Sequence, residues 1–305
     1  MQVGIVIVGF RNAADIEKCL AALENSTYRE FQIIICENGG DAAHSLLKNI
    51  LPSKLTGGQD VQLLKASNNG GYASGINLAI SQSAAPDAWW ILNPDTEPAP
   101  NALAALVGRL TQGYDAVGGP IYFPSGEVQS YAGVWLAWQA KAVSLGFGQS
   151  VGPAPTSHDL EVGQNFLSGA SMFVSRRFLD TVGLMDERYF LYCEEVDWFL
   201  RAERLGMRLG FTMGGAVIHH QGTTTGYGRS LRTRSCRAVY LDERNKMLLT
   251  RKFFPLRLPV AAFLAFARLV VRYGRQGAFR QIGYGAVGWL AGLCGQSGIP
   301  DWPRD

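Results

Sequence analysis

The sequence holds two groups of carboxylates that could do chemistry, and the first follows an apolar run. Residues 88–92 are typical of a buried strand and lead directly into Asn93-Pro94-Asp95. A carboxylate at the edge of such a strand can coordinate a hard divalent cation, which in turn neutralises a diphosphate. Asp95 could instead cap the turn before the helix predicted from residue 101, and Glu97 is predicted to serve that turn.

The second group contains Glu194, Glu195 and Asp197, directly after the apolar and aromatic segment Phe190-Leu191-Tyr192-Cys193. On a helix, Glu194 and Asp197 share a face because they are three residues apart, whereas Glu195 points elsewhere. Acids in a first helical turn are favoured by the helix dipole alone. Next to apolar residues, however, a carboxylate is partly desolvated and can act as a general base.

Two histidines, His219 and His220, end another apolar segment. Imidazole suits Mn²⁺ as well as softer metals, so either histidine could complete a metal site begun by Asp95. Taken alone, the pair is better explained as two surface histidines with hydrogen-bond partners.

A glycine- and asparagine-rich segment, NNGGYASGIN at residues 68–77, precedes a helical pattern. It resembles a turn that cradles phosphate at a helix N-terminus, although an ordinary tight turn explains it equally simply. It is neither a GxGxxG fingerprint nor a P-loop ending in GK[ST], which argues against dehydrogenases and kinases.

Strand and helix patterns alternate along the first 123 residues, which predicts right-handed βαβ units and a mostly parallel sheet flanked by helices. Ligands of such sheets bind beyond the carboxyl ends of the strands, where several of these strands end in polar groups. Further on, the sequence predicts a strand from residue 166, an amphipathic helix from Glu194 and a strand over 215–220, while residues 124–165 are expected to include loops that shape a cleft. The early strands are predicted at 3–10, 31–40 (ending in a turn), 61–67, 88–95 and 114–123, with helices at 13–23, 43–51 and 101–110 and a glycine-rich start that becomes a helix within 68–84.

Bulk composition indicates a globular α/β protein of 305 residues, with 47% hydrophobic and 17% charged residues. The beginning MQVGIVIVGF has no basic segment or cleavage site and is predicted to be the first strand. Five scattered cysteines without CxxC spacing indicate reduced thiols and a cytosolic protein.

The C-terminal part is basic, because about thirteen Lys and Arg stand against two acids between Arg229 and Arg280. This asymmetry predicts a region that meets an anionic surface. The apolar run at 253–273 is broken by arginines and a proline, which argues against a membrane span and favours a helix that lies on a membrane surface. Ordinary packing of these helices on the sheet is an equal alternative. We therefore expect a catalytic domain over 1–228 and a mainly helical region over 229–305.

Taken in order, these segments resemble family 2 glycosyltransferases of the GT-A fold, particularly the bacterial rhamnosyltransferase-like branch. The matching motifs run from the first strand to about residue 250. They are IVIVGFRN, EKCLAAL, Glu37-Asn38-Gly39-Gly40, Asn69 to Asn77, Leu-Asn-Pro-Asp-Thr at 92–96, Ser168-Gly169-Ala170, Gly183 with Asp186-Glu187, FLYCEEVDW, His219 with Thr224-Thr225-Gly226, and Arg244-Asn245.

The resemblance implies an inverting transfer of a sugar, with rhamnose as a candidate, from a nucleoside-diphosphate donor. The acceptor would be a saccharide or a polyprenyl-diphosphate-linked glycan of cell-surface polysaccharide synthesis, reached from the inner face of the membrane. It implies that Asp95 and His219 bind Mg²⁺ or Mn²⁺, and that Glu195, with Glu194 as the alternative, takes the proton from the acceptor hydroxyl. The residues implied to bind substrate are Phe10, Glu37, Asn38, Asn69, Gly71, Asn77, Asn93, Asp95, Gly169 and Asp197.

Some residues depart from the family pattern. Gly9 and Arg11 replace residues that are often Asn, and Glu37 and Glu195 are each one methylene longer than the usual Asp. The change at residue 37 leaves the nucleotide open among dTDP, UDP and GDP.

Two other functions fit the same fold. A nucleotidyltransferase would need a glycine-rich, basic N-terminal loop, and GFRNAAD is a poor match. A non-catalytic nucleotide-sugar-binding subunit would keep the fold without turnover. Nucleic-acid binding is not predicted, because the basic region lacks an aromatic-interleaved platform.

Overall fold

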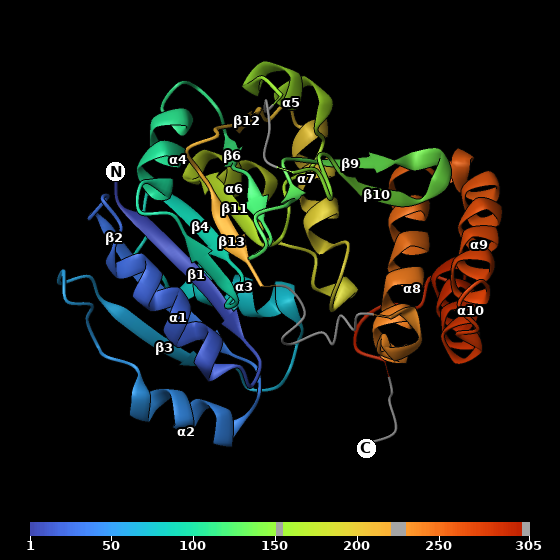
Figure 1. The fold of residues 1–305 in the computed structure, drawn as a ribbon, viewed down its shortest axis with the longest axis horizontal. Helices are drawn as coiled ribbons and strands as arrows, with labels where there is room; N and C mark the ends of the chain where they lie inside the picture. The colour runs from blue at the N-terminus through green and yellow to red at the C-terminus, as the bar shows by residue number, and fades with distance from the viewer. Residues whose placement is uncertain (151–154, 221–229, 301–305) are drawn as a thin grey trace.

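A seven-stranded sheet forms the centre of the computed structural model, which describes residues 1–150, 155–220 and 230–300 (Figure 1). Its strand order is β12-β6-β11-β4-β1-β2-β3. All neighbouring strands are parallel except β11, which runs antiparallel to β4 and β6, so the predicted mostly parallel α/β sheet is confirmed. The strands are β1 (Val3–Gly9), β2 (Phe31–Glu37), β3 (Val61–Lys65), β4 (Ala88–Leu92), β6 (Ala116–Gly118), β11 (Ser171–Ser175) and β12 (Leu209–Phe211).

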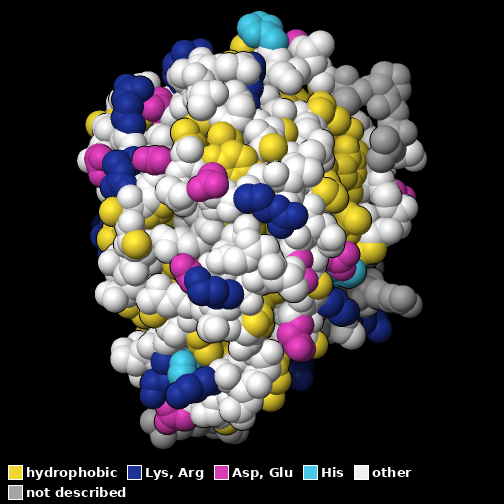
Figure 2. All heavy atoms as spheres, turned by 90° about the vertical axis from the view of Figure 1, so that its left-hand side faces the viewer, with side chains coloured by type: hydrophobic (Ala, Val, Ile, Leu, Met, Phe, Trp, Pro, Cys, Tyr) yellow, Lys and Arg dark blue, Asp and Glu magenta, His cyan; other side chains and the backbone are white. Residues whose placement is uncertain are grey.

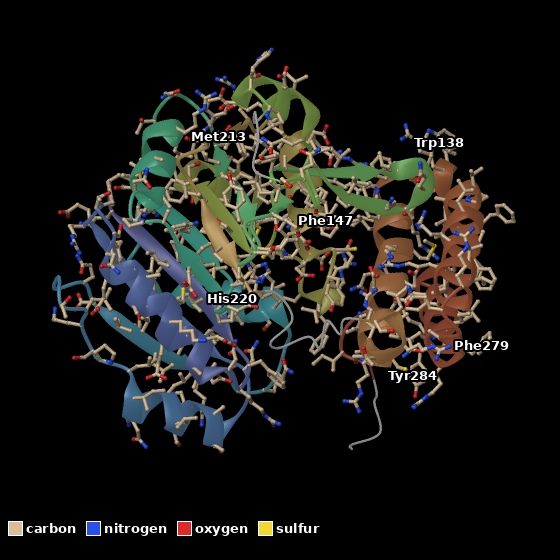
Figure 3. All side chains as sticks on the ribbon, in the orientation of Figure 1. Trp138, Phe147, Met213, His220, Phe279 and Tyr284 are labelled. Atoms are coloured by element: carbon tan, nitrogen blue, oxygen red, sulfur yellow. The ribbon has the colours of Figure 1, made fainter. Side chains whose placement is uncertain are left out.

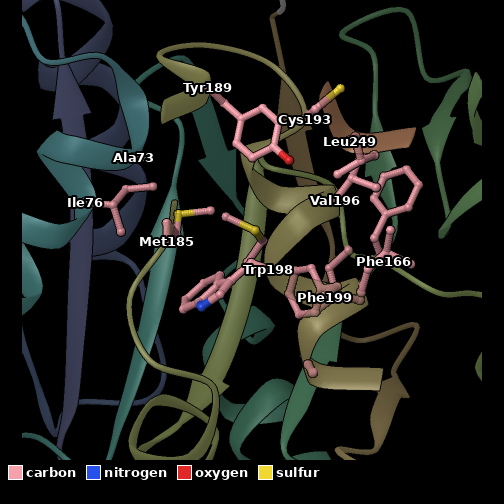
Figure 4. Close-up of a cluster of buried hydrophobic side chains, with 14 of the residues drawn as sticks. Ala73, Ile76, Phe166, Met185, Tyr189, Cys193, Val196, Trp198, Phe199 and Leu249 are labelled. Carbon is pink, nitrogen blue, oxygen red and sulfur yellow. The ribbon is translucent and has the colours of Figure 1, made fainter. Parts of the chain in front are cut away.

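Helices cover both faces of this sheet because its buried strands are apolar on both sides. Along β1, Val3, Ile5 and Ile7 join the core beneath α1 and α4. Val6 and Val8 join the opposite core, with α3, α6 and α7. Figure 4 shows Val196, Trp198 and Phe199 of α7 within that second core. The helices are α1 (Ala13–Glu24), α2 (Asp41–Ile50), α3 (Tyr72–Gln82), α4 (Ala102–Leu110), α6 (Arg176–Val182) and α7 (Glu194–Arg204).

A smaller sheet lies beside the first, with the order β5-β13-β7-β8. The strand predicted over 114–123 divides between the two sheets, because Gly119 and Pro120 interrupt it and Gly119 packs against the backbone of Gly215. The predicted strand at 215–220 also joins this smaller sheet and pairs antiparallel with β5. Its strands are β5 (Thr96–Pro98), β7 (Ile121–Tyr122), β8 (Val128–Ser130) and β13 (Val217–His219).

Residues 124–165, expected to include loops that shape a cleft, also contain regular structure besides β8. The hairpin of β9 (Gly133–Leu136) and β10 (Lys141–Ser144) reaches the C-terminal helices, where Arg268 donates hydrogen bonds to the carbonyls of Gln139 and Ala140 (Figure 1). A short helix, α5 (Ser157–Gly163), follows. The 3₁₀ turns of the chain are η1 (Ala137–Gln139), η2 (Glu187–Tyr189), η3 (Leu231–Thr233) and η4 (Pro255–Arg257).

Three helices form the C-terminal part: α8 (Cys236–Phe253), α9 (Leu258–Gly274) and α10 (Phe279–Leu293). Helix α10 lies directly on α8, since a Cβ at Gly288 or Gly292 would be 2.2 Å from a backbone oxygen of α8. Met247 and Leu249 of α8 belong to the same core as α7, so this part is built into the fold. The predicted boundary at 228/229 and the Thr224–Gly226 motif lie outside the described residues.

No helix in the described ranges is long and apolar enough to cross a membrane. All five cysteines are free, as predicted.

Candidate active site

Asp95 and His219 are brought together by the pairing of β5 with β13. His219 stands opposite Thr96 in that pair, and the amide of His220 donates to the carbonyl of Asp95. As a result, His219 Nε2 lies 3.1 Å from Asp95 Oδ1 and 3.3 Å from Asn93 Nδ2. The two predicted metal ligands, far apart in sequence, therefore share one buried corner.

The ring orientation of His219 is fixed from behind by Gln129. His219 Nδ1 lies 3.0 Å from Gln129 Oε1. An amide oxygen can only accept a hydrogen bond, so Nδ1 carries the hydrogen and Nε2 of the neutral ring presents its lone pair. That lone pair faces the Asp95 carboxylate, an arrangement that a cation between the two would stabilise. Gln129 acts on His219 as an outer-shell partner acts on a metal ligand.

The donor set consists of one carboxylate and one imidazole, and it fits a hard or borderline divalent cation. In the part of the chain that the structure describes, no cluster of three or more His, Cys, Asp or Glu side chains could hold a metal ion. A cation at Asp95 and His219 would thus need further oxygen ligands from a bound molecule or water, as is usual for Mg²⁺ with phosphates.

The acid pair stands at the N-terminus of α7. Glu194 is only 3% exposed, whereas Glu195 is half-buried, so the two side chains point differently, as the helical spacing predicts. Burial raises the pKa of Glu195 to about 7, and the charge of Asp242 adds to the rise. Burial also raises the pKa of Glu194, with the charge of Glu195 as the second cause. Glu195 is therefore the more accessible carboxylate and titrates near neutral pH.

Tyr72 connects the two acidic groups. Burial raises the pKa of its hydroxyl, and the charges of Glu194, Glu195 and Asp95 raise it further. The hydroxyl donates to the carbonyl of Gly169 at 2.7 Å.

The segment around Gly169 completes this connection. A Cβ at Gly169 would be 3.9 Å from Glu195 Cδ, and the next carbonyl, that of Ala170, accepts from the amide of Asn93 at 3.1 Å. The segment that begins at Asn93 and the acid pair are therefore linked through Tyr72 and residues 169–170.

Asparagines shape the turn that leads into α3. Asn69 Oδ1 accepts from the amide of Gly71, and Asn38 Nδ2 donates to its carbonyl. Gly71 has a φ of 91°, and a Cβ there would be 2.0 Å from the carbonyl oxygen of Phe190. Only glycine fits this position. The two asparagines are therefore oriented towards the backbone of the turn.

Glu37 ends β2 and is fully buried. Its Oε1 accepts from the amides of Gly39 at 2.6 Å and Arg11 at 3.1 Å. Its Oε2 has no hydrogen-bond partner among the described residues. The longer side chain fits because residue 9 is glycine: a Cβ at Gly9 would be 2.6 Å from Glu37 Oε2. The two departures from the family pattern are thus sterically linked.

The loop before the acid pair is strained. Phe190, Tyr192 and Cys193 have φ values of 66°, 74° and 69°, a region that costs non-glycine residues about 1–3 kcal/mol each. The surrounding structure must therefore hold the loop in place.

Two neighbouring helices, α3 and α8, hold this loop. The amide of Tyr72 donates to the carbonyl of Phe190 at 2.9 Å. From α8, Asn245 Nδ2 lies 2.7–2.9 Å from the carbonyls of Tyr189, Leu191 and Tyr192. Arg244 Nη2 also donates to the carbonyl of Tyr189. Helix α8 thus sets the position from which α7 and its acids begin.

We expect Asn245→Ala to destabilise the protein by roughly 2 kcal/mol, because it leaves buried carbonyls without their donor. Asn245→Asp should do no better, since a carboxylate cannot donate to carbonyls. Thermal unfolding measures the effect, with Asn49→Ala on an exposed position of α2 as the control. A melting temperature equal to that of the control would contradict the role given to Asn245.

Other predicted site residues have different surroundings. The side chain of Asn77 accepts a hydrogen bond from the amide of Met185 and donates to the carbonyl of the same residue. It also donates to Glu187 Oε1. Buried Asp197 accepts from Tyr189, Arg201 and Lys252. Both side chains hold the segment that leads to the acid pair, and their contact with substrate stays a prediction.

Two further residues lie near the ends of β1 and β4. Phe10 follows β1 and is half-buried beneath Arg11. Glu97 does not serve the following turn as expected, because it lies in β5 and pairs with His220 at 2.6 Å.

Sequence comparisons match more than half of this chain to known proteins. A family model described as "Glycosyl transferase family 2" matches residues 5–182, more than half of the chain. The chain is 27% identical over 247 residues to an N-acetylglucosaminyl-diphospho-decaprenol L-rhamnosyltransferase of Mycobacterium tuberculosis, covering 73% of this chain and 77% of that one. It is 22% identical over 313 residues to the low-salt glycan biosynthesis hexosyltransferase Agl10 of Haloferax volcanii, covering 98% and 94%.

Among solved structures, the mannosyltransferase PcManGT of Pyrobaculum calidifontis, in complex with GDP-Man and Mn²⁺, matches with a TM-score of 0.54. The match has 15% identity and covers 96% of this chain and 87% of that one. At this identity the likeness establishes the fold alone.

Proposed function

The chain belongs to glycosyl transferase family 2, and we propose that it moves a sugar from a nucleoside-diphosphate donor to a glycan acceptor with inversion at the anomeric carbon. The observation that carries this proposal is that Tyr72 and Gly169 connect the corner of Asp95 and His219 with Glu194 and Glu195. We propose that these two groups border one catalytic crevice. One side offers a place for a diphosphate and its cation, and the other offers a base for an acceptor hydroxyl.

On the donor side, Asp95 and His219 would hold Mg²⁺ or Mn²⁺. When bound, the cation would neutralise the charge that develops on the departing diphosphate. Asn93 would support His219, and Gln129 would keep its Nε2 directed at the site. Phe10, Asn38, Asn69 and Gly71 would line the nucleotide pocket. Mn²⁺ is present in the PcManGT complex, which supports this choice of cation.

Oε2 of Glu37 has no hydrogen-bond partner among the described residues, and we assign it to the N–H of a nucleobase, a contact that requires this buried side chain to become accessible when the donor binds. A carboxylate oxygen accepts from the ring N–H of uracil, thymine or guanine, whereas cytosine and adenine present a lone pair at the equivalent position. We therefore favour dTDP, UDP and GDP sugars over CDP and ADP sugars. With cytosine or adenine, the ring nitrogen and the carboxylate of Glu37 would both be acceptors, and neither would have a hydrogen-bond donor.

On the acceptor side, Glu195 would take the proton from the attacking hydroxyl. That oxygen forms a bond to the anomeric carbon while the bond from this carbon to the diphosphate breaks. Gly169 lies beside Glu195, and Tyr72 fixes Gly169 through its carbonyl. Glu194 is the alternative base, but its near-complete burial favours Glu195.

A lipid-diphosphate-linked glycan is the acceptor class that we favour, with rhamnose as the candidate sugar. The support is the printed name of the mycobacterial relative, an N-acetylglucosaminyl-diphospho-decaprenol L-rhamnosyltransferase. Such an acceptor places the protein at the inner face of the cytoplasmic membrane. We propose that residues 1–228 carry out transfer and that residues 229–305 support it there.

Calorimetric titration with a panel of nucleotide sugars tests the proposal. We expect binding that requires Mn²⁺ or Mg²⁺ and that favours uracil, thymine or guanine over cytosine and adenine by about tenfold or more. Glu37→Gln, which introduces a donor amide, should weaken this preference. Equal binding of all bases would contradict the role of Glu37, and binding unaffected by a chelator would contradict the metal site.

A further inference from the structure

Helix α9 presents an apolar face that nothing in the described chain covers. Leu256, just before the helix, is 94% exposed, Phe263 is 71% exposed and Val271 is 50% exposed. Val260, Leu264 and Val270 belong to the same face, since these residues are separated by three, four or seven positions, which returns them to one side of a helix. We call these six residues the docking face. An outward helix face of a globular protein is ordinarily polar, so such a stripe indicates a binding surface.

The tip of the β9–β10 hairpin borders the docking face at its N-terminal end. Trp138 is 54% exposed, and the guanidinium of Arg257 lies 5.1 Å from its ring centroid. Figure 3 shows Trp138 beside the upper end of α9. An exposed tryptophan next to an arginine is typical of the boundary between lipid headgroups and acyl chains.

The charged residues of α9 and of the segment that follows it have one sign. From Leu256 to Pro300 the sequence has five Arg and no Asp, Glu or Lys. Arg272 and Arg275 are exposed at the C-terminal end of the face. The opposite side of the molecule is different, because Figure 2 shows basic and acidic side chains scattered there together. An apolar stripe on a segment whose only charges are basic complements an anionic lipid surface.

Two other occupants fit less well. The face extends over roughly 20 Å along α9, but the helix carries Arg268 and Arg272 and does not meet the requirements of a membrane span. A second copy docked by two-fold symmetry would place these arginines near one another, with no acid in the segment to neutralise them. A helix lying flat in a bilayer surface satisfies both the apolar residues and the charge.

We propose that the docking face of α9 and Trp138 insert into the surface of an anionic bilayer and hold the crevice near lipid-linked substrates. The proposal rests on the proposed function for its purpose, but the binding itself can be measured without a sugar donor.

Co-sedimentation of the full chain with vesicles tests it, using phosphatidylcholine alone or mixed with phosphatidylglycerol. We expect binding to the mixed vesicles that weakens in high salt. Leu256→Ser with Phe263→Ser should reduce it about tenfold or more. The matched control is Leu46→Ser with Val162→Ser, two apolar residues that are 52% and 74% exposed on α2 and α5.

Equal loss in the control pair, or no binding to mixed vesicles, would overturn the proposal. So would a dimer in sedimentation velocity that the double variant of the docking face converts to a monomer. Donor binding is measured on the same variants. If wild-type protein binds vesicles but no nucleotide sugar, the proposed function fails while the docking face stands.

Discussion

Glu195→Gln is expected to lower the rate of sugar transfer by about 10²–10⁴-fold, the usual contribution of a positioned general base. Glutamine keeps the shape of the side chain but cannot take the proton of the acceptor hydroxyl. Donor binding should be unchanged, because Glu195 stands on the acceptor side of the crevice. Steady-state kinetics and donor titration of the same preparation separate the two effects.

The controls for this variant lie on the same helix. Glu203→Gln, on an exposed position of α7, should leave transfer unchanged. A larger loss in Glu194→Gln than in Glu195→Gln would move the base role to Glu194. Full activity of both variants would contradict a base role for either glutamate.

The pH dependence of transfer follows from the same carboxylate. Since burial raises the pKa of Glu195 to about 7, the group is protonated and inactive as a base at lower pH. The rate should therefore fall about tenfold per pH unit below that value and level off above it. In Glu195→Gln the residual rate should not show this fall at lower pH.

Asp95→Ala is expected to weaken donor binding in the presence of Mn²⁺ by about 100-fold or more, because it removes one of two side-chain ligands. This estimate exceeds the roughly 10–100-fold effect of losing an outer-shell partner. Titration of Mn²⁺ at fixed donor concentration measures the change. Without metal, wild-type and variant protein should bind the donor equally weakly.

Two variants calibrate this result. Glu97→Gln changes a carboxylate two residues away whose partner is the half-exposed His220, so it should have little effect. Gln129→Ala should weaken donor binding by about 10–100-fold, an effect between those of Glu97→Gln and Asp95→Ala. It frees the His219 ring without removing a ligand. Equal metal affinity of Asp95→Ala and wild-type protein would place the cation elsewhere.

The sequence predicts those parts of the site that depend on local pattern. The apolar run before Asp95 and the aromatic segment before Glu194 identify both acidic groups, because burial and helix spacing are encoded by neighbouring residues. The alternation of strands and helices likewise predicts the parallel sheet and the edge at which ligands bind.

Long-range pairing could not be predicted in the same way. The role of Gln129 depends on the order β5-β13-β7-β8, and no local motif distinguishes this glutamine. The hydrogen bonds from Asn245 to the loop at 189–192 depend on how α8 packs on α7. Asn77 belongs to a motif whose spacing suggests a ligand, yet tertiary contacts direct its side chain to Met185.

The contact between Gly9 and Glu37 restricts the order in which these two positions can mutate. Adding a side chain at residue 9 while glutamate occupies residue 37 would force an atom to within 2.6 Å of a buried oxygen. Shortening residue 37 first would remove this contact and leave only the approach to Ile16 Cδ1, at 2.9 Å, for that side chain to relieve. A mutational path towards the Asn and Asp of the family pattern must therefore begin with Glu37→Asp while residue 9 is still glycine. The reverse path must introduce glycine at residue 9 before it introduces glutamate at residue 37. The effects of the two substitutions are non-additive for this steric reason.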